Sequence, residues 1–186
     1  MKLEQLEEKM REYEKSRVIY EDTNLHSLVP FFQRRARHNL ETAKILWKIS
    51  EDEEAKKFLE ISGDYIGYDW IISTSYYAMY HSALAALAEI NLKTTTHETT
   101  IQALEYHFTH RQALLETEYI EAISEANQLE IQYINKLWRA KRTRIVAQYE
   151  ADKTMSKEDS EKLLSTAGDF VNRMDKLIDE LDKTNK

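Results

Sequence analysis

The sequence YDWIISTSYYAMYHSALAALAEIN, residues 68–91, lies in the middle of the chain and decides the fold. Its larger side chains recur at alternating steps of four and three residues, which is the spacing of one face of an α-helix. Small residues between them would let neighbouring helices approach closely. The spacing predicts a helix at the centre of the fold with one stripe, made of Trp70, Thr74, Tyr77, His81, Leu84 and Ala88.

The rest of the chain is poor in residues that break helices. Its 186 residues include three Gly and one Pro, and β-hairpin turns depend on residues with special backbone conformations, Gly above all. Further apolar patterns, separated by polar segments, predict helices over residues 31–49, 51–61, 97–110, 116–149 and 156–181. We therefore expect an all-α protein, an antiparallel helical bundle of five to seven helices.

Residues 1–30 are expected to form an N-terminal helical arm ahead of a bundle over residues 31–186. Leu3, Leu6, Met10 and Tyr13 make an apolar seam on an otherwise charged helix. The seam is too short for a free-standing coiled coil, so we favour docking on the chain's own bundle over a contribution to a dimer.

Composition excludes several classes of protein. The absence of Cys excludes a disulfide scaffold and thiol catalysis. A net charge of −7 argues against a protein that coats nucleic acid over its whole surface. The N-terminus lacks the apolar run of a signal peptide, and no stretch approaches the roughly 20 apolar residues of a membrane-spanning helix. We expect a soluble, cytoplasmic protein with no membrane contact.

The sequence lacks the common motifs of metal and nucleotide sites in helical proteins. None of the six His has Glu three residues before it, so the ligand pattern of a di-iron bundle is absent. The chain has neither a Gly-rich phosphate loop nor a Gly-x-Ser-x-Gly elbow. His107 and His110 could share a helix face, with His97 at the start of the same helix, but no third ligand is phased with them. We expect no metal and no cofactor, and we expect His81 to be a buried neutral histidine hydrogen-bonded to Tyr or Ser.

A basic run stands out near the C-terminal third of this acidic chain. Residues 136–144 read KLWRAKRTR, in which five of nine are basic. Cations are favoured at a helix C-terminus by the helix dipole, and charge runs are often solvated faces. Arg side chains also offer a rigid fork to phosphate oxygens. Both interpretations stay open; the second makes Arg139, Lys141, Arg142 and Arg144 a candidate phosphate or nucleotide site.

Several of these segments together resemble one family. Residues 68–81, YDWIISTSYYAMYH, resemble the D-x-x-x-S-x-x-Y-Y-A-M-[FY]-H helix of HEPN-domain proteins, small helical proteins often found beside minimal nucleotidyltransferases. Residues 38–44, 93–101, 144–149 and 155–171 are similar to other family segments in matching order. The resemblance implies a bundle that dimerises, in which Asp69, Ser73, Tyr77 and His81 form the supporting central helix.

The resemblance also implies what the basic run does. Ribonuclease members carry Arg, four to six residues and then His in a cleft between subunits, and they cut RNA without a metal. Here Tyr149 stands at the position of that His, and Gln148 replaces the carboxylate before it. Tyr has a usual pKa near 10, against about 6.5 for His, and is a poor general base at neutral pH.

Two functions follow from the resemblance. We expect a dimeric binding protein for RNA phosphate, a nucleotide or a nucleotidyltransferase partner, with weakened or absent catalysis. The alternative is a metal-independent endoribonuclease, the toxin of a toxin–antitoxin pair, in which Arg144 and Tyr149 are catalytic.

Overall fold

The computed structural model describes residues 3–142 and 155–184 of the chain. Within these ranges it forms seven α-helices, a 3-10 turn, a π-helical segment and a sheet of two strands, which confirms the all-α helical fold. In chain order the elements are α1 (Leu3–Lys15), β1 (Ile19–Glu21), η1 (Leu25–Leu28), α2 (Val29–Glu51), α3 (Glu53–Phe58), α4 (Tyr68–Glu89), β2 (Leu92–Thr94), α5 (His97–Leu104), η2 (Glu105–Arg111), α6 (Thr117–Arg142) and α7 (Lys157–Thr184).

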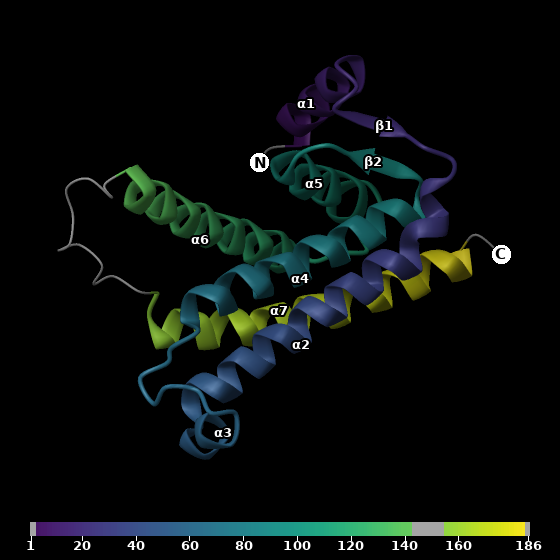
Figure 1. Cartoon of the computed structure of the whole chain (residues 1–186). Helices are drawn as coiled ribbons and strands as arrows, with labels where there is room; N and C mark the ends of the chain where they lie inside the picture. The colour runs from purple at the N-terminus through teal and green to yellow at the C-terminus, as the bar shows by residue number, and fades with distance from the viewer. Residues whose placement is uncertain (1–2, 143–154, 185–186) are drawn as a thin grey trace.

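Helix α4 is the centre of the bundle. It packs most extensively against α2 and α7, and it also contacts α5 and α6. Figure 1 shows α2, α4 and α7 side by side, with α4 antiparallel to α2 and parallel to α7. Although α4 is the most apolar helix, no helix in the described ranges is long and apolar enough to cross a membrane.

The core lies between α4 and the helices that pack on it. Ile72, Tyr76 and Met79 of α4 are fully buried, as are Phe170 and Met174 of α7. Burial of side chains of this size stabilises a fold by about 1.5–3 kcal/mol each. These five residues therefore fix how α7 sits on α4.

Several of the helices begin at a residue whose side chain caps the helix N-terminus. The Asp52 carboxylate accepts hydrogen bonds from the second and third residues of α3, at 2.9 and 3.1 Å. Thr96 forms a capping box with Thr99 at the start of α5. Ser156 Oγ accepts a hydrogen bond of 3.0 Å from the backbone N–H of Asp159. These bonds satisfy backbone donors that have no partner inside a helix.

The N-terminal helix docks on the bundle as its apolar seam predicted. Leu6 and Met10 are buried, and α1 contacts α5 and η2. The Tyr13 hydroxyl donates a hydrogen bond of 2.9 Å to Oε1 of Gln102. The helix therefore uses its seam within its own chain.

A small sheet is a departure from the expected purely helical fold. Strand β1 pairs with β2 in antiparallel register, with Ile19 opposite Thr94. Between α4 and β2, Asn91 adopts a left-handed backbone with φ 57°, and its carbonyl accepts a hydrogen bond of 2.8 Å from the N–H of Asp22. Strands of three residues are too short to give an alternating pattern, so the sequence carried no signal for this pairing.

The helix expected over residues 97–110 also differs from a single α-helix. Its second half is the π-helical segment η2, which contains His107 and His110. Leu114 and Leu115 follow η2, and their backbone N–H groups donate hydrogen bonds to the carbonyl of Phe108 within it. A π turn is wider than an α-helical turn, so the α-helical spacing from which a shared face of His107 and His110 was inferred does not apply to this segment.

Candidate functional site

The stripe expected along α4 exists, but it is not the core face of the helix. Thr74, Tyr77, His81 and Leu84 are only half buried, and 57% of Trp70 is exposed to solvent. Helix α4 is apolar around most of its circumference. The spacing of its larger side chains therefore identified one face of the helix, but it could not show which face packs against the rest of the bundle. The buried face instead carries Ile71, Ile72, Tyr76, Met79 and Ala83.

Tyrosines and histidines gather around Tyr77 and His81, two members of this stripe. The Tyr76 hydroxyl forms a hydrogen bond of 2.8 Å with Nδ1 of His97 at the start of α5. The Tyr80 ring lies 4.2 Å from the His97 ring, centroid to centroid. We call Tyr76, Tyr77, Tyr80, His81 and His97 the Tyr–His cluster. Four of its five members are partly exposed, so the cluster forms part of the surface.

His81 is held in one tautomer. Its Nδ1 lies 2.7 Å from the carbonyl oxygen of Tyr77, and 3.3 Å from Nδ2 of Asn39 in α2. A carbonyl only accepts hydrogen bonds, so Nδ1 carries the proton and donates it, which leaves Nε2 as the acceptor of the neutral ring. Burial, with a smaller contribution from Arg35, lowers the pKa of His81. His81 is therefore half buried where we expected it to be buried, and its partner is a backbone carbonyl in place of a Tyr or Ser hydroxyl.

Glu130 of α6 is a buried carboxyl group near the Tyr–His cluster, and it was not among the predicted site residues. Burial raises its pKa. Its charge in turn contributes to the raised pKa values of Tyr76 and Tyr77, after the larger effect of their own burial. Glu130 follows Ile123 by seven residues and precedes Tyr133 by three, so a carboxylate on an apolar helix face was the signal that could have identified it.

Asp69 lies apart from the Tyr–His cluster, in the first turn of α4. Its Oδ1 accepts a hydrogen bond of 2.8 Å from the backbone N–H of Met155, two residues before α7 begins. Ser73, one turn further along α4, is half buried. The structure thus brings Tyr77 and His81 together, with ring centroids 6.2 Å apart, and gives Asp69 a different structural contact.

The predicted phosphate site falls at the edge of the described chain. Arg139, Lys141 and Arg142 lie in the last turns of α6, and their side chains are outside the described part. Arg144 and Tyr149 lie outside the described residues altogether. Three further Arg residues, Arg34, Arg35 and Arg37, lie near the start of α2. Arg37 is already paired, because it forms an ion pair of 3.0 Å with Asp175.

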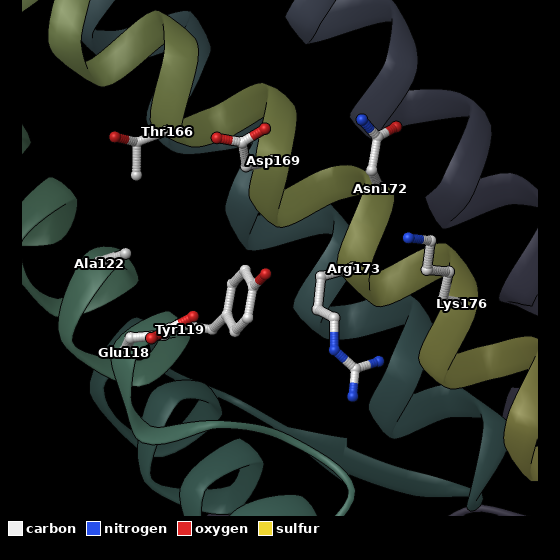
Figure 2. Close-up of a pocket in the computed structure, with 8 residues that line it drawn as sticks. All are labelled: Glu118, Tyr119, Ala122, Thr166, Asp169, Asn172, Arg173 and Lys176. Carbon is white, nitrogen blue, oxygen red and sulfur yellow. The ribbon is translucent and has the colours of Figure 1, made fainter.

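A surface groove of about 400 Å³ runs between α6 and α7. Figure 2 shows the Tyr119 ring extending from α6 toward α7, whose Arg173 and Lys176 line the other wall. Arg173 is already paired, with Glu116 at 2.9 Å and Glu180 at 3.8 Å. The groove also contains acidic residues, so its charge is mixed and it does not select an anion.

The bundle around a central Tyr–Tyr–Ala–Met–Tyr–His helix defines a class of protein. A model of the HEPN domain matches residues 29–177, from the first residue of α2 into α7. The chain belongs to the HEPN-domain family. A comparison with curated proteins found no match. The matched range begins at α2, so it does not include α1, β1 and η1.

Proposed function

We propose that this HEPN-family chain is a homodimeric binding protein that holds an RNA phosphate or a nucleotide with the basic run of residues 136–144. Catalysis is weak or lost in this proposal, because Tyr149 stands where ribonucleases of the family carry His. A tyrosine keeps its proton at neutral pH and cannot accept one from a ribose hydroxyl at a useful rate.

The single observation that carries the proposal is the concentration of positive charge at one place in an acidic chain. Five of the nine residues in the basic run are Lys or Arg, while the whole chain has a net charge of −7. The backbone of α6 is helical as far as Arg142, so Arg139 and Arg142 are about one turn apart along one helix. The guanidinium group of Arg is a planar fork that suits bidentate binding of phosphate oxygens.

A second copy of the chain is the proposed occupant of the open stripe of α4. Beside the Trp70–Tyr133 ring contact, at 6.3 Å, α6 exposes 42% of Ile131 and 36% of Ile134. Exposed apolar and aromatic side chains of this kind are typical of protein interfaces. The HEPN resemblance supports a second copy as the partner, since it implies a dimer.

RNA cleavage and RNA binding, measured together, test the proposal. The purified protein would be incubated in EDTA with a fluorescein-labelled single-stranded RNA, and the products would be separated on a denaturing gel. We expect intact RNA, and we expect binding that is weakened by Arg142→Ala and Arg144→Ala. Lys57→Ala on α3 is the matched control, since it also removes one positive charge at an exposed position.

The other outcomes distinguish the alternatives. Cleavage that is lost in Arg144→Ala would establish the metal-independent ribonuclease toxin and overturn the proposal. No binding of RNA or of nucleoside triphosphates would also overturn it, and would leave a nucleotidyltransferase partner as the occupant of the basic run.

A further inference from the structure

Three potential metal-ligating side chains converge at one end of the bundle. His26 comes from η1, Glu89 is the last residue of α4, and Asp182 lies in the last turns of α7. One ligand atom from each residue lies within 4.8 Å of the other two. Nε2 of His26 and Oε1 of Glu89 are 3.2 Å apart. We call these three residues the His–Glu–Asp cluster.

Glu89 is the buried member of the His–Glu–Asp cluster. Only 3% of its side chain is exposed, whereas 55% of the His26 side chain is exposed. A buried carboxylate is costly unless its charge is compensated. Among the described residues, no Lys or Arg forms an ion pair with Glu89 or Asp182. The compensating positive charge must come from protonated His26, from a proton shared by the carboxyls, or from a bound cation.

The electrostatics of Glu89 agree with this account. Burial is the largest cause that raises the pKa of Glu89, and the neighbouring Asp182 raises it further, while His26 lowers it. Two carboxyl groups side by side, one of them buried, are an arrangement that a divalent cation stabilises better than a single imidazole does.

His26 is positioned by contacts that do not depend on a cation. Its backbone N–H donates a hydrogen bond of 3.2 Å to Oδ1 of Asn91. The Asn91 carbonyl in turn accepts the N–H of Asp22 at 2.8 Å. These two bonds fasten the loop before η1 to the end of α4, so the imidazole is presented to Glu89 before any ligand binds.

We propose that the His–Glu–Asp cluster binds one divalent transition-metal ion, with zinc as the representative probe. One imidazole nitrogen and two carboxylate oxygens are a donor set that zinc accepts, with solvent in the remaining position. Binding requires the exposed His26 and Asp182 side chains to close on the buried Glu89, because zinc holds its ligands at about 2.0–2.2 Å.

The bound ion has a structural role, because it joins three chain segments. It links η1, which precedes the matched HEPN domain, to the C-terminal ends of α4 and α7. Figure 1 shows these ends at one side of the molecule, while the end of α6 lies at the other. The site is therefore separate from the basic run, and its test does not depend on the proposed function.

Calorimetric titration of metal-stripped protein with zinc chloride tests the proposal. We expect one binding site per chain, and we expect His26→Gln and Asp182→Asn each to weaken zinc binding at least tenfold. His110→Gln is the matched control, because His110 also faces one carboxylate, Glu105 at 3.4 Å, but has no second carboxylate in a described cluster. This variant is expected to bind zinc as the wild type does.

Two results would overturn the proposal. One is the absence of zinc binding at micromolar protein concentration. The other is binding that His26→Gln leaves unchanged, which would show an adventitious surface site. Because His26 and Asp182 are exposed, both variants are expected to fold, and circular dichroism of each confirms that a loss of binding is not a loss of structure.

Discussion

The carboxylate of Asp69, in the first turn of α4, accepts a hydrogen bond of 2.8 Å from the backbone N–H of Met155. The two residues are 86 positions apart in the sequence. A second bond, from Ser160 Oγ to the carbonyl of Tyr68, joins the same two chain segments at 3.3 Å. Asp69 thus fixes where α7 begins against α4.

Replacing Asp69 should therefore destabilise the bundle. We expect Asp69→Ala to lower the free energy of unfolding by about 1–3 kcal/mol, because a charge-assisted hydrogen bond between the starts of α4 and α7 is lost. Urea unfolding followed by circular dichroism measures the change. Asp179→Ala, at an exposed position on α7, should change it by less than about 0.5 kcal/mol. Equal effects of the two substitutions would contradict this role.

The hydroxyl of Tyr76 is predicted to contribute to the stability of the fold. Tyr76 is fully buried, and its hydroxyl is hydrogen-bonded to Nδ1 of His97. Tyr76→Phe keeps the ring but leaves the half-buried imidazole without this partner, so we expect a loss of about 1–2 kcal/mol in unfolding free energy. Thermal unfolding with calorimetry measures it, and an unchanged midpoint would show that water replaces the bond.

The stability of the protein is predicted to fall between about pH 6.5 and pH 4 because of His107. Burial, with a smaller effect of Arg111, lowers the pKa of His107 to about 4. The unfolded chain has a pKa near 6.5 at this residue, so it takes up a proton first as the pH falls, and the folded state loses roughly 2–3 kcal/mol relative to it.

Replacing His107 tests this pH dependence. In His107→Gln, the decline in unfolding free energy from pH 7 to pH 4 should be shallower than in the wild type, as measured by urea titrations at several pH values. His38→Gln, at an exposed position of α2, should leave the decline unchanged. A parallel decline in wild type and His107→Gln would show that other groups cause it.

The proposed dimer surface is tested by a charge at its most exposed aromatic residue. Trp70→Glu should convert the dimer into a monomer, because a carboxylate cannot be buried between two apolar faces without a partner. Light scattering after size exclusion gives the mass directly. Phe58→Glu is the control, since Phe58 is 86% exposed on α3, away from the stripe. A monomeric wild type, or a Trp70→Glu dimer, would contradict the proposed surface.

Much of the fold could be predicted because its signals are local. The long central helix and the docking seam of α1 both depend on residues within a few positions of one another. The pairing of β1 with β2 and the π turn of η2 could not be predicted. The strand pairing joins short segments that are far apart in the chain. The spacing of apolar residues cannot distinguish a short π-helical segment from an α-helix.

The candidate sites also differ in whether their residues are close together in the sequence. The residues of the basic run are consecutive, so the sequence reveals them. The His–Glu–Asp cluster joins η1, α4 and α7, and no motif spans those distances, which is why the sequence predicted no metal site. The sequence predicted the stripe of α4, but not its exposure to solvent. That exposure depends on where α2, α6 and α7 pack against α4. An almost uniformly apolar helix carries no sequence signal for which of its faces the neighbouring helices cover.

The most direct test of the central claim is a fluorescence anisotropy titration of a labelled single-stranded RNA over a series of salt concentrations. The account predicts that Arg142→Ala and Arg144→Ala weaken binding and reduce the slope of log affinity against log salt by about 0.7 for each lost phosphate contact. Lys57→Ala should leave both quantities unchanged. Arginine variants whose affinity and salt slope equal those of the wild type would contradict a phosphate site at the basic run.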